Sequence, residues 1–208
     1  MVTTLQAQKV TLYDLETRFK LKLTNDEAFF PEWRGNLPEI TDAEKAQLNR
    51  VKDNYINLAK RGMLEDLVKM VVLSPLLDLA GFYSPPFYTT SEKSVEITEV
   101  DEELIIRGKI DVLMLQSDLW VLVIESKKAG FSLEMGIPQA LAYMLASLRK
   151  DKPLFGFVTN GSNFIFLKLI EKDSNPVYSL SDEFTLRRGN DLYSVLGILK
   201  NLSQTLAV

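Results

Sequence analysis

Residues 104–128 read LIIRGKIDVLMLQSDLWVLVIESKK, and this stretch decides the fold prediction. Both of its halves are rich in apolar residues, and the polar segment Gln116-Ser117-Asp118 separates them. Two apolar runs of strand length around a short polar turn are typical of an antiparallel hairpin. We therefore expect one strand over 104–115, with Gly108 as a bulge or bend, and a second strand from Leu119 to Lys128.

Helical patterns precede the hairpin. The sequence Thr41-Asp42-Ala43-Glu44 has the form of a capping box and predicts the start of a helix. The apolar face of this helix would consist of residues at helical spacing, namely Leu48, Val51, Tyr55 and Leu58. A second helix is expected from Gly62 to about Ser74, where Pro75 either kinks it or opens a last helical stretch ending at Gly81.

Other elements are predicted from the same two periodicities. A weak strand pattern covers 93–98, and a short helix is expected over 12–21. A second hairpin is indicated by LFGFVT and FIFLKLI on either side of Asn160-Gly161-Ser162. Helices are expected over 132–148, where Pro138 begins or kinks the helix, and over 191–206.

The chain of 208 residues has the size of one domain with a further short element, because domains usually run about 100 to 200 residues. We expect an α/β fold with a mixed central sheet flanked by helices. Residues 1–60 would form an N-terminal extension, with its helix packed on a main domain of residues 61–208.

The chain contains no histidine and no cysteine. This excludes Ser-His-Asp and Cys-His catalysis, histidine- or cysteine-based zinc sites, and disulfide bonds. Catalysis would then depend on carboxylates and lysines, together with a hard cation such as Mg²⁺ that prefers oxygen ligands.

Charge and hydropathy further narrow the class of protein that the sequence could encode. The net charge is −4, and it divides into −6 for residues 1–106 and +2 for residues 107–208, so a polyanion would bind the second half. The apolar run Leu119–Ile124 is far shorter than the roughly 18 residues of a membrane helix. The N-terminus lacks the pattern of a secretory signal, so we expect a cytoplasmic protein with no membrane partner.

The hairpin brings carboxylates together. A turn near residues 117–118 places Asp111 opposite Ile124 or Glu125, within one residue of register, and Glu125 and Lys127 share a strand face. A cation held by Asp111 and Glu125 could activate a water toward a phosphodiester, with Lys127 orienting that water or stabilising charge. The competing interpretation is a structural ion cluster, which spacing alone favours.

Asp111 followed after thirteen residues by Glu125-Ser126-Lys127 resembles the PD-(D/E)XK nuclease motif. Four segments in order resemble the nuclease domain of type I restriction enzyme R subunits, over about residues 60–170. They are Gly108–Asp111, Val123–Lys127, Gln139–Tyr143 and Phe155–Gly161. The resemblance implies a restriction-endonuclease-like core.

The resemblance also implies roles. Asp111 and Glu125 would bind Mg²⁺ or Mn²⁺, Lys127 would be the catalytic lysine, and Gln139 and Tyr143 would lie beside the site, with Gln139 also near DNA. Without the family, the Gln139–Tyr143 pair reads equally well as the polar rim of a packed helix, since residues i and i+4 share a face.

Glu65 matches the acid that the superfamily places on the helix before the sheet. An exposed Glu65–Lys69 pair at i, i+4 is the alternative interpretation. Two features depart from the family: Ile110 replaces the proline of the motif, and no G-x-x-x-x-G-K-[ST] sequence occurs, so this chain is not expected to translocate along DNA.

Basic residues near the proposed site could contact DNA phosphates, namely Arg107, Lys109 and Lys128. We expect a divalent-metal-dependent DNA endonuclease of the restriction type, with DNA and subunits of a restriction-modification system as partners. A homodimer would be one way to cut both strands. The alternative is a catalytically silent nuclease-fold module that binds DNA or partner subunits. A hydrolase acting on another substrate would leave Lys127 unexplained.

Overall fold

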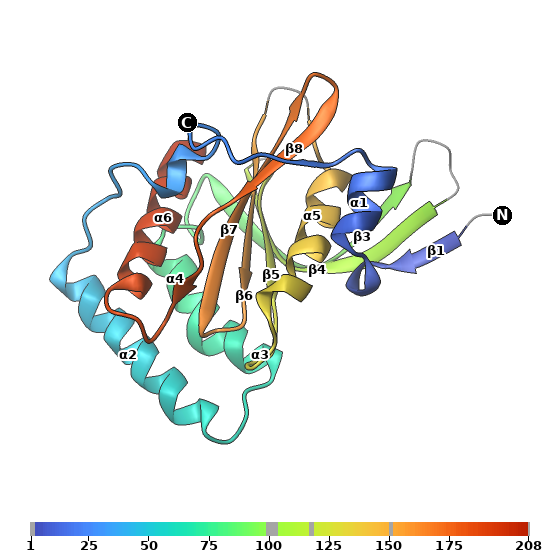
Figure 1. Cartoon of the computed structure of the whole chain (residues 1–208). Coiled ribbons are helices and arrows are strands. Elements are labelled where there is room, and N and C mark those ends of the chain that lie inside the picture. Colours follow the sequence, from blue (N-terminus) through green and yellow to red (C-terminus); the bar gives the residue numbers. More distant parts are fainter. Residues whose placement is uncertain (1–2, 99–103, 117–118, 150–151, 208) are drawn as a thin grey trace.

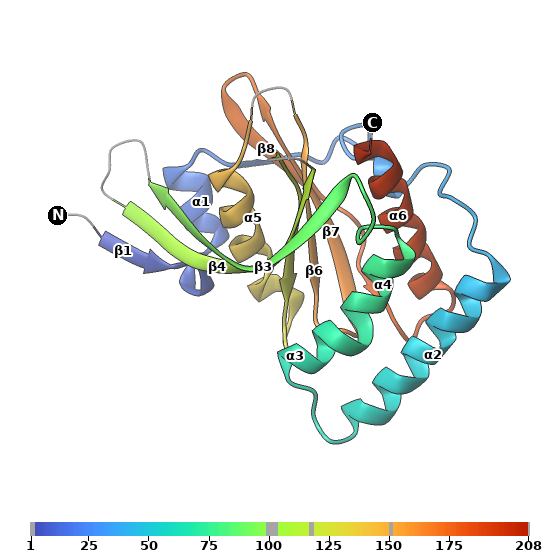
Figure 2. The same ribbon diagram turned by 180° about the vertical axis from the view of Figure 1, so that it is seen from behind.

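The computed structural model describes residues 3–98, 104–116, 119–149 and 152–207. In this part of the chain, helices cover both faces of one mixed sheet (Figures 1 and 2). The predicted fold class, a mixed central sheet flanked by helices, is therefore confirmed. No helix among the described residues is long and apolar enough to cross a membrane.

The central strands run in the order β1-β4-β5-β6-β7-β8-β2, while β3 pairs with β4 and β9 pairs with β7. Their bounds are β1 Thr3–Gln6, β2 Lys22–Leu23, β3 Phe87–Thr98, β4 Leu104–Gln116, β5 Leu119–Ser126, β6 Leu154–Thr159, β7 Asn163–Lys172, β8 Asn175–Leu180 and β9 Phe184–Thr185. Strands β4 and β5 are antiparallel, as are β6 and β7, so both predicted hairpins are confirmed. Residues 117–118 of the first turn lie outside the described part.

The α-helices are α1 Leu12–Arg18, α2 Asp42–Ala59, α3 Glu65–Val68, α4 Ser74–Leu79, α5 Ile137–Ala146 and α6 Asp191–Leu206. A π-helical segment, η3 Lys69–Leu73, joins α3 to α4, and short 3₁₀ turns cover η1 Ala7–Lys9, η2 Pro31–Trp33 and η4 Leu133–Met135. The predicted capping box forms at the start of α2, where Thr41 and Glu44 exchange hydrogen bonds. Pro75 and Pro138 lie in the first turns of α4 and α5, so each begins a helix.

Each face of the sheet has its own hydrophobic core, because successive residues of a strand point to opposite faces. On β5, Leu122 and Ile124 pack in the core beneath α2, α4 and α6, whereas Val123 packs in the core beneath α5 and α1. All three side chains are fully buried. The continuous apolar run of β5 reflects this burial on both faces.

The N-terminal region differs from its prediction. The short helix expected over 12–21 is present as α1, but two strands of this region were not predicted: β1 pairs in parallel with β4, and β2 pairs in parallel with β8. Gly108 forms no bulge, since it pairs with Val95 in an unbroken register, and the alternative of a bend there remains a prediction. A side chain at Gly108 would overlap the Tyr143 hydroxyl at 2.5 Å, so the glycine permits a close approach of α5 to β4.

Along one of its edges, β4 pairs with two different strands. Residues 104–107 pair with β1, and residues 112–116 pair with β5. Between these two ladders, residues 108–111 have no strand on that edge among the described residues. The sheet therefore opens at this point, and helices α3 and α5 approach the opening from its two faces (Figure 2).

Candidate active site

A cavity of about 680 Å³ lies at the opening between β1 and β5. Its lining includes all six residues that the sequence predicts to be catalytic, namely Glu65, Asp111, Glu125, Lys127, Gln139 and Tyr143. They come from α3, β4, the end of β5 and α5. The topology therefore brings together residues that are separated by almost eighty positions in sequence.

The two predicted metal ligands lie at the point where β4 and β5 part. The ladder ends with Val112 opposite Ile124, so Asp111 and Glu125 are the next residues on their strands, within the predicted register. The Ser126 backbone N–H donates to Asp111 Oδ2 at 2.7 Å. Glu125 is only 2% exposed, and its Oε2 atom is buried with no hydrogen-bond partner in the part of the chain that the structure describes.

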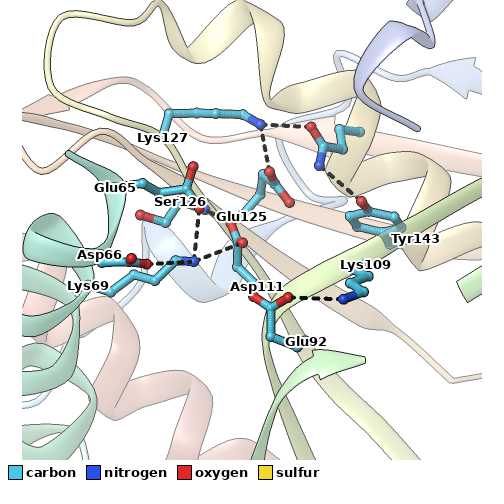
Figure 3. Close-up of polar contacts among 11 residues, drawn as sticks. Glu65, Asp66, Lys69, Glu92, Lys109, Asp111, Glu125, Ser126, Lys127 and Tyr143 are labelled. Atoms are coloured by element: carbon cyan, nitrogen blue, oxygen red, sulfur yellow. Dashed lines mark hydrogen bonds and ion pairs between the residues drawn. The ribbon is translucent and has the colours of Figure 1, made fainter. Parts of the chain in front are cut away.

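A chain of hydrogen bonds connects Glu125 to α5 (Figure 3). Lys127 Nζ donates to Glu125 Oε1 at 2.6 Å and to Gln139 Oε1 at 2.7 Å. Gln139 Nε2 then donates to the Tyr143 hydroxyl at 2.9 Å. Gln139 and Tyr143 are buried, so this pair lies beside the site as the resemblance implies, with no exposed polar rim.

On the other side of Asp111, Lys69 reaches in from the start of η3 (Figure 3). Its Nζ atom lies 2.8 Å from Glu65 Oε1 and 3.0 Å from Asp111 Oδ1. The Glu65–Lys69 pair at i, i+4 therefore exists, but it is part of the site and not an isolated surface pair. Sequence reasoning missed the contact of Lys69 with Asp111, because only the fold brings η3 next to β4.

Burial and mutual repulsion control the ionisation of the acids. Burial, followed by the nearby charge of Asp111, raises the pKa of Glu125 to about 8. Burial and the charge of Glu65 also raise the pKa of Asp111, against the opposing effect of Lys69. The pKa of the Tyr143 hydroxyl is raised by burial and by Glu125, so this group stays protonated as a donor. Both acids therefore favour the protonated form more strongly than they would in water.

The donor set suits a hard divalent cation. In the described part of the chain, no three acidic side chains converge into a complete metal cage. Mg²⁺ does not require one, since it usually takes one or two carboxylates and completes its shell with water and phosphate oxygens. The Oε2 atom of buried Glu125, which has no partner among the described residues, could serve as a metal ligand. The residues present therefore fit the implied cation.

Two of the basic residues predicted to contact DNA line the cavity, and the third lines a neighbouring pocket that shares Lys127 and Gln139 with it. Arg107 and Lys109 line the cavity and form ion pairs with acids of β3, Arg107 with Glu96 at 2.6 Å and Lys109 with Glu92 at 3.6 Å. Lys128 is exposed, with its Nζ 4.6 Å from the centre of the Phe131 ring. Their contact with DNA remains a prediction.

The site has the arrangement of the PD-(D/E)XK class. An Asp lies on one strand, a Glu-x-Lys lies at the end of the next, and flanking helices add Glu65 and Gln139. Within this class, the chain belongs to the family described as type I restriction enzyme R protein N terminus, whose model matches residues 13–175. The match begins well before residue 60, so part of the N-terminal region, for which the sequence resemblance gave no counterpart, belongs to the family too.

Among solved structures, the chain is similar to a fragment of a putative HsdR subunit of a type I restriction enzyme from Vibrio vulnificus YJ016. The identity is 21% and the TM-score is 0.41, with 65% of this chain covered. The chain spans a quarter (25%) of the length of that protein. No curated protein matches the chain.

Proposed function

We propose that this chain is a divalent-metal-dependent DNA endonuclease of the restriction type. The observation that carries the proposal is the convergence of Asp111, Glu125 and Lys127 on one cavity, with one Glu125 oxygen left unpartnered. Membership of the restriction enzyme family supports DNA as the substrate. Subunits of a restriction-modification system are the partners that we propose on the same ground.

In the proposed mechanism, Asp111 and Glu125 would hold Mg²⁺ or Mn²⁺ where β4 and β5 part. When bound, this cation would polarise the scissile phosphate and lower the pKa of a water molecule. The buried position of Glu125 lowers the local dielectric and so strengthens each electrostatic interaction there.

Lys127 would position the attacking water or stabilise the negative charge that develops on the phosphate. Gln139 accepts from Lys127 and donates to Tyr143, so α5 fixes the ammonium in place. The bond to Gln139 would hold the Lys127 ammonium beside Glu125 and the phosphate. Gln139 and Tyr143 are therefore positioning residues in this account.

Cleavage of DNA tests the proposal. The purified chain is incubated with supercoiled plasmid and Mg²⁺ or Mn²⁺, beside Lys127→Ala, Asp111→Asn and a reaction with chelator. We expect nicked or linear product from the wild type, and a loss of about 10²–10³-fold in rate for each variant. Cleavage that survives both substitutions would sink the assignment.

A second candidate is a catalytically silent module that binds DNA or partner subunits. It is favoured by the ion pairs that Lys69 and Lys127 already make with the three acids. Calorimetric titration with Mg²⁺ separates the two functions, because a silent module need not bind the cation. Absence of Mg²⁺ binding, even with DNA present, would count against catalysis.

A further inference from the structure

Lys69 lies where a cation is needed. Its ammonium group contacts Glu65 at 2.8 Å and Asp111 at 3.0 Å, and the Lys69 side chain is only 20% exposed. Asp66, at 3.9 Å, is almost fully exposed and contributes little. An ammonium ion between two carboxylates has the same electrostatic role as a bound metal, but without the directed coordination bonds.

The backbone of this segment is adapted to that position. Lys69 is the first residue of the π-helical turn η3, and the Ser74 N–H donates to the Lys69 carbonyl five residues earlier. A π-turn adds one residue to an α-helix, which rotates the residues before the turn by about 100° relative to the residues after it. The turn therefore directs Glu65 toward the cavity and Lys69 toward Asp111, while α4 stays packed in the core.

Three acids of the site share two lysines. Among the described residues, the carboxyl groups of Glu65, Asp111 and Glu125 form ion pairs with two ammonium groups, those of Lys69 and Lys127. Lys127 forms an ion pair with Glu125, whereas Lys69 pairs with Glu65 and Asp111. Asp111 is the one proposed metal ligand whose carboxylate is held by Lys69.

We propose that Lys69 is a tethered counter-cation, which neutralises Glu65 and Asp111 while the metal is absent and competes with the metal for Asp111. The inference rests on the proposed metal-dependent function and adds a control to it. A cation can bind Asp111 fully only when the Lys69 ammonium moves away, and the flexible four-carbon stem of lysine allows that movement. Lys69 therefore lowers the affinity for metal and stabilises the metal-free site.

The test compares the wild type with Lys69→Met, which keeps a side chain of similar length without charge. Lys69→Gln is a second variant in case the first does not fold, and circular dichroism checks folding. Lys45→Met is the matched control, since Lys45 also pairs with an acid on its own helix, Asp42, but far from the site. Calorimetric titration with Mn²⁺ alone gives the affinity, and thermal unfolding in chelator gives the stability of the metal-free protein.

We expect Lys69→Met to bind Mn²⁺ on the order of tenfold more tightly than the wild type, a typical size for coupling between two sites. Its melting temperature in chelator should fall, and Mn²⁺ should raise that temperature more than in the wild type. Lys45→Met should match the wild type in affinity. Detectable binding by Lys69→Met alone would support the proposal as well.

Equal or weaker Mn²⁺ binding by a folded Lys69 variant would overturn the counter-cation proposal and leave the metal-dependent function intact. Failure of every protein to bind Mn²⁺, the Lys69 variants included, would overturn the metal-dependent function and the counter-cation with it. The two failures are therefore distinguishable in one titration series.

Discussion

Glu125 has one carboxylate oxygen open to a proton or a metal. Its Oε1 accepts from Lys127, and its Oε2 is buried with no partner among the described residues. Burial is the larger cause of its raised pKa, and repulsion from Asp111 adds to it. At the scale of a single residue, an ionised Glu125 therefore destabilises the folded, metal-free protein.

The raised pKa of Glu125 makes the free energy of unfolding depend on pH. Glu125 has a pKa of about 8 when folded and an ordinary value of 4.5, so between these values the folded state keeps a proton that the unfolded state has lost. Rising pH then favours the unfolded state, by at most about 1.4 kcal/mol per pH unit. In chelator, the free energy of unfolding should fall from about pH 4.5 to 8, as urea titrations would show.

The control is Glu125→Gln, which cannot ionise and still offers Lys127 an oxygen acceptor. Its stability should vary less with pH across the same window. A slope equal to that of the wild type would show that Glu125 is not the group responsible. Asp111 works in the same direction, so some slope will remain.

Local motifs identified the residues of the site, but not all of their contacts. Asp111, Glu125 and Lys127 were predicted from the hairpin and the family motif, and Gln139 and Tyr143 from the family resemblance. The contact between Lys69 and Asp111 joins residues 42 positions apart. No local pattern reports such a contact, because it depends on the π-turn and on the packing of α3 against the sheet.

At the scale of elements, long periodic segments were predictable and short strands were not. Both hairpins and helix α2 have repeating apolar patterns over six or more residues. Strand β1 has only four residues and β2 only two, too few to show an alternation. Their partners lie far away in sequence, so the tertiary structure decides that they are strands.

The contact between β4 and α5 depends on Gly108. A methyl group there would lie 2.5 Å from the Tyr143 hydroxyl and 2.7 Å from the Ala7 side chain. Gly108→Ala should therefore destabilise the fold by about 1–3 kcal/mol through overpacking. It should also displace Tyr143 and reduce cleavage. Denaturant unfolding measures the first effect and the plasmid assay the second.

Lys109→Ala is the control for this substitution, since Lys109 is the next residue of β4 and its side chain is 63% exposed. It should change the free energy of unfolding by less than about 0.5 kcal/mol. If Gly108→Ala were as stable as Lys109→Ala, the close approach of Tyr143 to β4 would not matter for stability.

At the scale of the whole molecule, the N-terminal region is bound to the rest through the core. Phe30 is buried against Phe155 of β6, with ring centroids 6.0 Å apart. Lys168 of β7 pairs with Glu32 at 2.6 Å, and both side chains are largely buried. The boundary at residue 60 that the sequence suggested remains a prediction.

The contribution of the Glu32–Lys168 ion pair to the stability of the protein can be measured. Lys168→Met should destabilise the protein by about 3 kcal/mol, because it leaves Glu32 buried without its counter-charge. The double variant with Glu32→Met should recover much of the loss, which a double-mutant cycle in urea would quantify. Additive losses would mean that the two side chains act independently.

The central claim is that Asp111 and Glu125 hold one divalent cation. Anomalous diffraction from a crystal soaked in Mn²⁺ tests it most directly. We predict a single anomalous peak within about 2.0–2.6 Å of an oxygen of each carboxylate, with the Lys69 ammonium moved away from Asp111. A fully soaked crystal with no peak between these carboxylates, and with Lys69 still bound to Asp111, would contradict it.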